Sequence, residues 1–361
     1  MARQGSEQRS SARSALALLV GGTACFALVM VVMLLLTSSP TGGTAHDADS
    51  SQTAGTHALK MEIPVVEDTP RPLESPDAPG EGDAMPAEPT SAKPAPDVSA
   101  TRFARLQEDV ERVASSASMQ VGVSVLDLAT GAAASYHGSD AQVSASMIKL
   151  VVAAAYLEQV AAGVLDLDAT YTLQQADLVG GTGSLVYQGA GAAVSYRELL
   201  TKMLSQSDNT AANVLIRTVG MEAVNAEAVR LGLSSTRLNR LMMDEEAMAA
   251  GIENYTSADD CALLLKMAYE GTFVSPEASA LVLHALEQQE DAGGVLAGLP
   301  AGTIFAHKTG TLATCRHDGG IVEGDHPFVL VVLCGGEGFY EQGALDVMAR
   351  IASTVYEDFS R

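Results

Sequence analysis

Four residues at the start of a hydrophobic segment, Ser146-Met147-Ile148-Lys149, could do chemistry together. A serine hydroxyl is a weak nucleophile until a base removes its proton. Residues three apart on a helix share one face, so Lys149 would lie within reach of the Ser146 oxygen. Burial and a neighbouring cation lower the pKa of a lysine, which can then act as a base, whereas arginine stays charged. The spacing predicts an activated serine, although the motif alone is a weak signal.

Two more short motifs follow in the chain, Ser207-Asp208-Asn209 and Lys308-Thr309-Gly310. Taken singly, the three motifs could be a helix N-cap, a turn and an edge-strand lysine. Together, in this order, they resemble the motifs of class A β-lactamases and penicillin-binding serine transferases. The middle motif resembles its class A counterpart as far as Asn213. The resemblance covers roughly residues 101–361 and implies a serine hydrolase.

The resemblance assigns the chemistry of acyl transfer to four residues. Ser146 would attack an amide carbonyl and form an acyl-enzyme, and Lys149 would accept or relay its proton. Lys308 would supply the positive charge that keeps Lys149 partly neutral. Ser207 would pass a proton to the departing nitrogen. The resemblance implies no cofactor and no metal.

The same resemblance predicts how the substrate is held. Asn209 would hydrogen-bond a side-chain amide of the substrate. Lys308 and Thr309 would bind a carboxylate, which β-lactams and D-Ala-D-Ala cell-wall peptides both carry, and Gly310 would let the strand approach the ligand closely. Backbone N–H groups of Ser146 and Thr311 would form the oxyanion hole.

One departure from the class A pattern concerns the second half of the reaction. The segment from Thr236 to Met242 resembles the start of the loop that carries the deacylating glutamate, and Met242 occupies the place of that glutamate. Asp244, Glu245 and Glu246 could substitute if the loop is rearranged, but loop carboxylates are more often exposed. Losing a general base typically costs ~10²–10⁴-fold in rate. We therefore expect acylation to be supported and fast turnover to be doubtful.

Several other residues have two readings. Arg316 lies where some family members place an arginine for the substrate carboxylate, but it could equally be a surface arginine. His307 and His317 flank the third motif.

Cys315 and Cys334 could form a disulfide outside the cell, or the cysteines beyond the N-terminal segment could all be unpaired. No Gly-x-Ser-x-Gly motif occurs, which disfavours a Ser-His-Asp hydrolase, and residues 180–183, Gly-Gly-Thr-Gly, are typical of a turn.

Strands are expected at both ends of the folded part and helices between them. The apolar pattern predicts strands at 120–128, 132–136, 303–311, 319–322 and 328–334. It predicts helices at 103–113, 146–162, 196–204, 257–271 and 345–359. It also predicts one helix that begins after 208–209 and ends near 220, one that ends at 232, and one that begins at 275–276. The fold class is therefore α+β: an antiparallel sheet built from both ends of the domain, flanked by helices, with an all-helical middle lobe.

The first hundred residues differ in composition from the rest. Residues 1–14 form a short basic stretch, and an apolar run at 15–37 is long enough to cross a bilayer as an uncleaved anchor. The basic flank predicts a cytoplasmic N-terminus, with the catalytic domain (101–361) outside the cell membrane. Residues 38–100 contain ten of the thirteen prolines and many acidic residues, which predicts a disordered linker.

Charge and the motifs together limit the function classes. A net charge of −23 opposes nucleic-acid binding, which relies on Lys and Arg meeting phosphates. The motifs favour β-lactam cleavage through an acyl-serine. A D,D-peptidase or other cell-wall acyl hydrolase is an alternative, for which Met242 is the best argument. A β-lactam sensor that traps the acyl group is a third, weakened because residues 1–14 leave no room for a signalling domain.

Overall fold

The computed structural model describes residues 98–361. The predicted cytoplasmic stretch (1–14), the membrane anchor (15–37) and most of the linker (38–100) lie outside these residues. Within 98–361, none of the helices is both long and apolar enough to span a bilayer. The first described helix, α2 (Val98–Ala114), begins shortly before the predicted domain start at Thr101.

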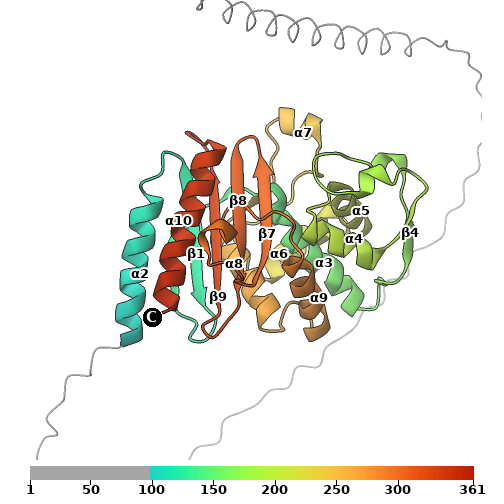
Figure 1. Ribbon diagram of the computed structural model, residues 1–361. Helices are drawn as coiled ribbons and strands as arrows, with labels where there is room; N and C mark the ends of the chain where they lie inside the picture. Colours follow the sequence, from blue (N-terminus) through green and yellow to red (C-terminus); the bar gives the residue numbers. More distant parts are fainter. Residues whose placement is uncertain (1–97) are drawn as a thin grey trace, which may run out of the picture. The chain divides into compact units, whose positions relative to one another are not determined.

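A five-stranded antiparallel sheet joins the two ends of this unit, in the order β2-β1-β9-β8-β7 (Figure 1). Its strands are β1 (Gln120–Asp127), β2 (Ala133–Tyr136), β7 (Phe305–Leu312), β8 (Cys315–Val322) and β9 (Phe328–Gly335). The register pairs Gln120 with Gly335 across β1 and β9, and Lys308 with Gly319 across β7 and β8. Among residues 98–361, β7 pairs only with β8, so it is an edge strand with one unpaired side.

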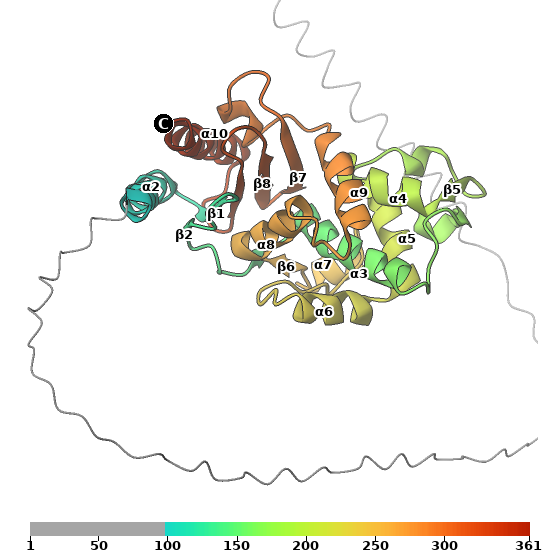
Figure 2. The same ribbon diagram turned by 90° about the horizontal axis from the view of Figure 1, so that it is seen from below.

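Both faces of the sheet are covered, so the central strand β9 is apolar along its whole length. Val329 and Val331 face the core shared with the helical lobe, while Leu330 and Val332 face a second core. This alternation is the two-residue period of a strand. Figure 2 shows α2 and α10 (Glu341–Phe359) on one face and α8 (Ala258–Tyr269) on the other.

The middle of the chain forms a helical lobe beside the β7 edge of the sheet (Figure 1). Its centre is α3 (Lys149–Ala161), in which every residue from Lys149 to Leu157 is buried, as expected for a helix packed on all sides. The other helices of the lobe are α4 (Tyr196–Ser205), α5 (Asn209–Val219), α6 (Met221–Arg230), α7 (Glu245–Ala249) and α9 (Pro276–Glu287), of which α4, α5 and α6 pack on α3. The α+β class, with strands at both ends and helices between, is thereby confirmed.

The main differences from the predicted elements are local. The segment around Ser146 is a 3-10 helix, η1 (Ala145–Ile148), followed by α3, instead of one α-helix. β8 begins at Cys315, four residues before its predicted start, because His317 and Asp318 are buried polar residues that hide the apolar pattern. The pattern also missed several short elements. Two are the two-stranded sheets, which pair β3 (Gln142–Val143) with β6 (Tyr255–Thr256) and β4 (Thr170–Thr172) with β5 (Ala193–Ser195). The others are α7 and the 3-10 turns η2 (Gln175–Asp177), η3 (Leu185–Tyr187) and η4 (Leu296–Gly298).

The cysteines of the described part are all unpaired. Cys261, Cys315 and Cys334 are buried with free thiols. Cys334 lies opposite Arg316, and Cys315 lies opposite Gly335. Since paired residues project from the same face and successive residues from opposite faces, Cys315 and Cys334 point away from each other. Of the two predictions for these cysteines, a disulfide or unpaired thiols, the structure shows unpaired thiols.

Candidate active site

The predicted nucleophile lies where η1 meets the edge strand β7. In a 3-10 helix, residues three apart are nearly eclipsed, and the Lys149 Nζ lies 3.0 Å from the Ser146 Oγ. Ala145, just before the serine, has a positive φ of 44°, a conformation that non-glycine residues rarely adopt. Ser207 (φ 54°) and Met243 (φ 57°) are also in this region of backbone space. All three line the same pocket, as expected where surrounding structure holds strained backbone at a functional site.

Lys149 is completely buried and surrounded by oxygen atoms. Its Nζ donates to the Ser207 backbone carbonyl at 2.6 Å and to the Asn209 Oδ1 at 2.7 Å, and it lies 3.2 Å from the Ser207 Oγ. Burial, followed by the nearby charge of Lys308, holds the pKa of Lys149 well below its usual value, while Asp208 partly opposes the shift. A neutral lysine amine 3.0 Å from a serine hydroxyl can accept its proton.

The Ser207 hydroxyl lies between the two buried lysines. The Lys308 Nζ donates to the Ser207 Oγ at 3.0 Å and to the Thr309 carbonyl at 2.8 Å. Burial lowers the pKa of Lys308 to about 7, although Asp318 and Asp291 raise it. Ser207 therefore contacts one amine on each side and can relay a proton between Lys149 and a group in the pocket.

Asp208 holds the second motif in place. Its Oδ1 caps α5 by accepting from the Ala211 N–H at 2.8 Å, and its Oδ2 accepts from the Ser184 and Leu185 N–H groups at 2.7 and 2.8 Å. A Cβ at Gly183, which has a φ of 97°, would lie 2.2 Å from that Oδ2, so only glycine fits there. The glycine-rich segment is a loop, as predicted, and it also contributes Gly181 and Thr182 to the pocket wall.

The third motif approaches the nucleophile along β7. A Cβ at Gly310 would lie 3.2 Å from both the Ser146 backbone nitrogen and the Ala145 Cβ, so the lack of a side chain lets β7 pack closely on η1; the approach of Gly310 to a ligand stays a prediction. Thr309 and Thr311 line the pocket. Because β7 is an edge strand, alternate N–H groups point away from the sheet.

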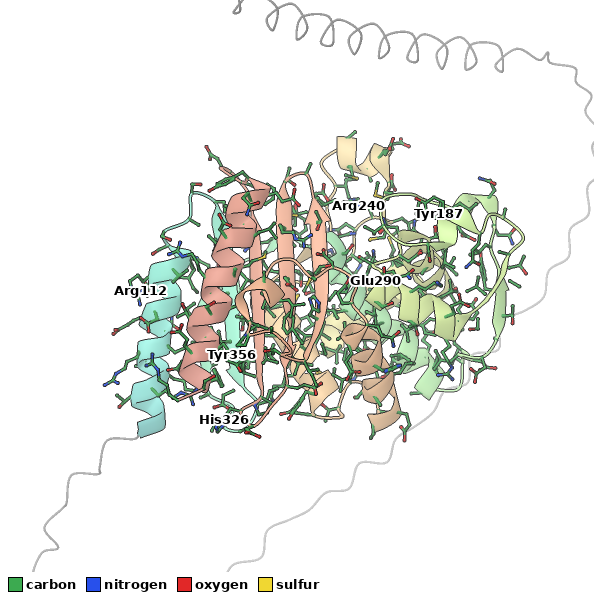
Figure 3. All side chains as sticks on the ribbon, viewed as in Figure 1. Arg112, Tyr187, Arg240, Glu290, His326 and Tyr356 are labelled. Carbon is green, nitrogen blue, oxygen red and sulfur yellow. The ribbon has the colours of Figure 1, made fainter. Side chains whose placement is uncertain are left out.

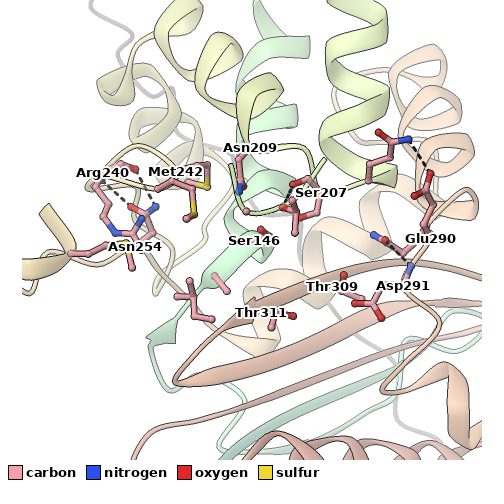
Figure 4. Close-up of a pocket in the computed structure, with 18 residues that line it drawn as sticks. Ser146, Ser207, Asn209, Arg240, Met242, Asn254, Glu290, Asp291, Thr309 and Thr311 are labelled. Carbon is pink, nitrogen blue, oxygen red and sulfur yellow. Dashed lines mark hydrogen bonds between the residues drawn. The ribbon is translucent and has the colours of Figure 1, made fainter. Parts of the chain in front are cut away.

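The predicted site residues surround one cavity of about 470 Å³ (Figure 4). Ser146, Ser207, Asn209, Thr309 and Thr311 line it. Lys149 and Lys308 lie just behind its wall, bound to Ser207, and Gly310 packs against the Ser146 backbone. The other lining residues are Ala145, Gly181, Thr182, Gln206, Arg240, Met242, Met243, Met248, Asn254, Gln289, Glu290, Asp291 and Leu312.

Met242 enters the cavity from a firmly held loop. Asn213 in α5 accepts from the Met242 N–H at 2.8 Å and donates to the Met242 carbonyl at 3.0 Å. Asn254 accepts from the Arg240 N–H at 2.9 Å and donates to the Arg240 carbonyl at 3.1 Å, and Arg240 pairs with Glu253 at 2.6 Å. Met242 is only 6 % exposed and lines the pocket that contains Ser146.

The three acidic residues after Met242 do not reach the cavity. The Asp244 Oδ1 accepts from the Ala247 N–H at 3.0 Å and thereby caps α7. Glu245 and Glu246 are exposed, and none of the three lines the pocket. The loop therefore presents a thioether, which cannot act as a base, at the residue that the sequence predicts to replace the class A glutamate.

The charged residues around the third motif are buried, and Arg316 is therefore not the surface arginine that was one of its two predicted roles. Arg316 is 7 % exposed, and its Nη1 donates to the Thr311 Oγ1 at 2.6 Å. The His307 Nδ1 lies 2.8 Å from the Asp318 Oδ1 on the same sheet face. The His317 Nε2 lies 2.7 Å from the Val143 carbonyl, and burial lowers the pKa of His317 to about 4, so this ring is neutral near pH 7.

Two acidic residues of the cavity were missed by the sequence analysis. Glu290 and Asp291 follow α9 and lie across the pocket from Met242 (Figure 4). Figure 3 shows Arg240 and Glu290 at the boundary between the sheet and the helical lobe. No motif marks Glu290 and Asp291, because only the packing of α9 beside β7 brings them to the site. Within 98–361, no cluster of three or more His, Cys, Asp or Glu residues could hold a metal ion.

Comparisons with known proteins agree with this geometry. Over 59 % of its length the chain is 29 % identical to the extended-spectrum beta-lactamase PER-1 of Pseudomonas aeruginosa, of which 73 % is covered. It is 26 % identical to the beta-lactamase CARB-3 of the same organism, with coverage of 59 % and 74 %. The beta-lactamase structure from Sphaerobacter thermophilus matches with a TM-score of 0.64 and 25 % identity, covering 72 % of this chain and 98 % of that one. Residues 105–359 match the profile of the Beta-lactamase enzyme family, and the chain belongs to that family.

Proposed function

We propose that this protein is a serine hydrolase of the class A β-lactamase type that opens β-lactams through an acyl-serine intermediate. The observation that carries the proposal is the buried Lys149, whose Nζ lies 3.0 Å from the Ser146 Oγ and whose pKa is lowered by burial and by Lys308. A helix-capping serine needs no such partner. The names of the similar enzymes, PER-1 and CARB-3, support a β-lactam as the substrate.

Acylation begins with the Ser146 Oγ attacking the lactam carbonyl carbon while its proton passes to the neutral Lys149 Nζ. The carbonyl π electrons move to the oxygen, which the N–H groups of Ser146 and Thr311 would stabilise; an oxyanion donor of this kind is typically worth about 3–4 kcal/mol. The edge position of β7 and the close packing of Gly310 on Ser146 support this role.

Collapse of the tetrahedral intermediate breaks the carbon–nitrogen bond. The departing nitrogen takes the proton of the Ser207 hydroxyl, and Ser207 regains one from the protonated Lys149. The contacts of the Ser207 Oγ with Lys149 at 3.2 Å and with Lys308 at 3.0 Å support this relay. The products of the first half-reaction are an ester on Ser146 and an opened ring.

Substrate binding uses the two sides of the same cavity. Lys308, Thr309 and Thr311 would bind the carboxylate beside the lactam nitrogen. Asn209 would bind the side-chain amide of the substrate, but its Oδ1 accepts from Lys149 and its Nδ2 donates to the Gly180 carbonyl at 2.9 Å. Asn209 therefore also fixes Lys149 and the 180–183 loop, and the amide would share its hydrogen bonds.

Deacylation requires a water molecule activated near the ester, and here the chain departs from the class A pattern. Met242 lines the cavity at the position expected for the glutamate, and no carboxylate of its loop lines the pocket. We expect slow hydrolysis of the acyl-enzyme. A D,D-peptidase and an acyl-trapping sensor are the two alternatives that slow turnover would suit, and the comparisons favour neither of them.

For location, we propose that residues 15–37 hold the domain at the outer face of the cell membrane. The support is the sequence alone, a long apolar run with a basic flank. Fractionation of cells that produce the full chain should recover it with membranes, and protease added outside should digest the domain. Recovery in the soluble cytoplasm would contradict this location.

The test of the function is the reaction with a chromogenic cephalosporin. A burst of one equivalent followed by a slow, steady rate would support acylation with slow turnover. Loss of the burst in Ser146→Ala is expected. No burst and no turnover in the wild type would contradict the proposal, while a burst that then stops completely would favour a trap or a peptidase.

A further inference from the structure

The two ends of the active-site cavity differ in chemistry. One end is lined by Met242, Met243 and Met248, beside Asn254 and an Arg240 that is paired with Glu253. The other end is lined by the carboxylates of Glu290 and Asp291. In Figure 4, Ser146 lies between Met242 and Glu290, and Ser207 lies toward the acidic end. Since Ser207 is the proposed proton donor to the nitrogen, the acidic end faces the leaving-group half of the substrate.

Asp291 forms an ion pair with Arg316, the arginine that is bound to Thr311 in the proposed carboxylate site. The Arg316 Nη2 donates to Asp291 and lies 2.8 Å from the Oδ1 and 2.7 Å from the Oδ2. The Arg316 Nη1 is bound to the Thr311 Oγ1. Although burial opposes it, the hydrogen bond and charge of Arg316 lower the pKa of Asp291, so this carboxylate is ionised at pH 7. The pair is close to neutral, and Arg316 is not free to form a paired contact with a substrate anion.

Glu290 differs from Asp291 because it has no cationic partner. Its Oε1 accepts from the Gln206 Nε2 at 2.9 Å, and no ion pair of Glu290 occurs in the part of the chain that the structure describes. Gln206 directly precedes Ser207, so the hydrogen bond fixes Glu290 next to the proposed proton donor. An exposed, unpaired carboxylate remains at the mouth of the cavity.

We propose that Glu290 and Asp291 select substrates whose leaving-group half carries a cation in addition to its carboxylate. This inference rests on the proposed function, and it names the substrate class for the same site. A substrate carboxylate held by Thr309 and Thr311 directs the next substituent toward Glu290. A cation there is attracted by Glu290, whereas a second anion is repelled and cannot recruit Arg316 while Asp291 holds it.

The size of the effect follows from Coulomb's law near a protein surface. Two unit charges several ångströms apart, in a partly solvated pocket mouth, change a rate constant by about three- to tenfold. The preference between a cationic and an anionic substituent combines an attraction and a repulsion. We therefore expect the two compounds to differ by about ten- to a hundredfold in the wild type.

The experiment compares three cephalosporins that have the same acyl side chain and a pyridinium, an acetoxy or a carboxylate-bearing group at the position next to the ring carboxylate. The second-order rate constant of acylation is measured for each with the full-length protein. The order expected for the wild type is cationic, then neutral, then anionic. Glu290→Gln removes both the attraction and the repulsion, so it should reduce the cationic-to-anionic ratio about ten- to a hundredfold. Glu290→Asp, which keeps the charge, should retain the ratio.

Asp291→Asn tests the second part of the inference. Arg316 is then released, so the anionic compound should react faster while the cationic one changes less. Asp325→Asn removes one charge from an exposed position that does not line the pocket and should leave all ratios unchanged. Each readout is a ratio within one variant, so a loss of folded protein cancels.

The outcomes separate this inference from the function on which it rests. If the wild type is acylated by all three compounds at similar rates, or if Glu290→Gln keeps the wild-type ratio, the charge selection is wrong and the function stands. If none of the compounds acylates the wild type, the proposed function fails and the selection fails with it. An equal change of ratio in Asp325→Asn would assign the effect to overall charge and also overturn the inference.

Discussion

Replacing Met242 with glutamate should convert slow hydrolysis of the acyl-enzyme into fast hydrolysis. Asn213 holds the backbone of residue 242 from both sides, at 2.8 and 3.0 Å, so a new side chain is directed into the cavity as the methionine is. Met242 is 6 % exposed, and a carboxylate at this position would lose most of its hydration. Desolvation raises a carboxyl pKa and makes the group a better base near pH 7.

The expected magnitude follows from what a positioned base contributes. General base catalysis supplies ~10²–10⁴-fold, so the deacylation rate constant of Met242→Glu should rise by about that factor. The carboxylate is nearly buried, and we expect the free energy of unfolding to fall by about 1–3 kcal/mol. The acylation rate constant should change much less, because Ser146, Lys149 and Ser207 are untouched.

The assay follows the lifetime of the acyl-enzyme. Protein is acylated with a chromogenic cephalosporin, excess compound is removed, and the intact mass of the protein is recorded over time. Met242→Gln is the matched control, because it has nearly the size of glutamate and cannot act as a base. Equal lifetimes in Met242→Glu, Met242→Gln and the wild type would refute the reasoning and show that residue 242 does not face the ester.

Three further predictions concern Lys149, Lys308 and the cysteines. Lys149→Ala should lower the acylation rate constant by ~10²–10⁴-fold. In the wild type this rate constant should also fall as pH decreases, because Lys149 becomes protonated, and the variant should lack that fall. A wild-type pH profile in the variant would contradict the role of Lys149 as base. Burial lowers the pKa of Lys308 to about 7 in the folded protein, so between pH 10.5 and 7 the unfolded state binds more protons than the folded state. Lys308 therefore makes the protein less stable as pH decreases through this range, and Lys308→Met should lack this contribution in thermal unfolding. Identical pH profiles of stability in the variant and the wild type would contradict the burial argument. Alkylation of the unfolded protein without reductant should label Cys261, Cys315 and Cys334 fully, whereas two unlabelled thiols would indicate a disulfide.

The sequence predicted the main elements because their signals are local. The helix predicted to begin after 208–209 begins at Asn209, as α5, and is capped by Asp208. Ser257 and Ser275 cap α8 and α9, as expected from their positions before apolar repeats. The strand β9 was visible as an apolar run because it is covered on both faces. The spacing of Ser146 and Lys149 was sufficient to predict their contact, in a 3-10 turn as in an α-helix.

The parts that were missed depend on packing between distant segments. Glu290 and Asp291 become part of the cavity only because α9 packs beside β7. Arg316 could be read as a surface residue because its partners, Asp291 and Thr311, come from other segments of the chain. The single hydrogen bond of Gln206 with Glu290 joins residues that are far apart in sequence, and no local pattern encodes it. The chemistry of the nucleophile was therefore predictable, and the charge of the pocket wall was not.

The central claim is that Ser146 is acylated by a β-lactam, and mass spectrometry of the intact protein tests it most directly. After incubation with a cephalosporin that loses no substituent on ring opening, the mass should rise by the full mass of the compound. Digestion should place the adduct on the peptide that contains Ser146, and Ser146→Ala should show no adduct. An unchanged mass in the wild type, or an adduct that persists in Ser146→Ala, would contradict the account.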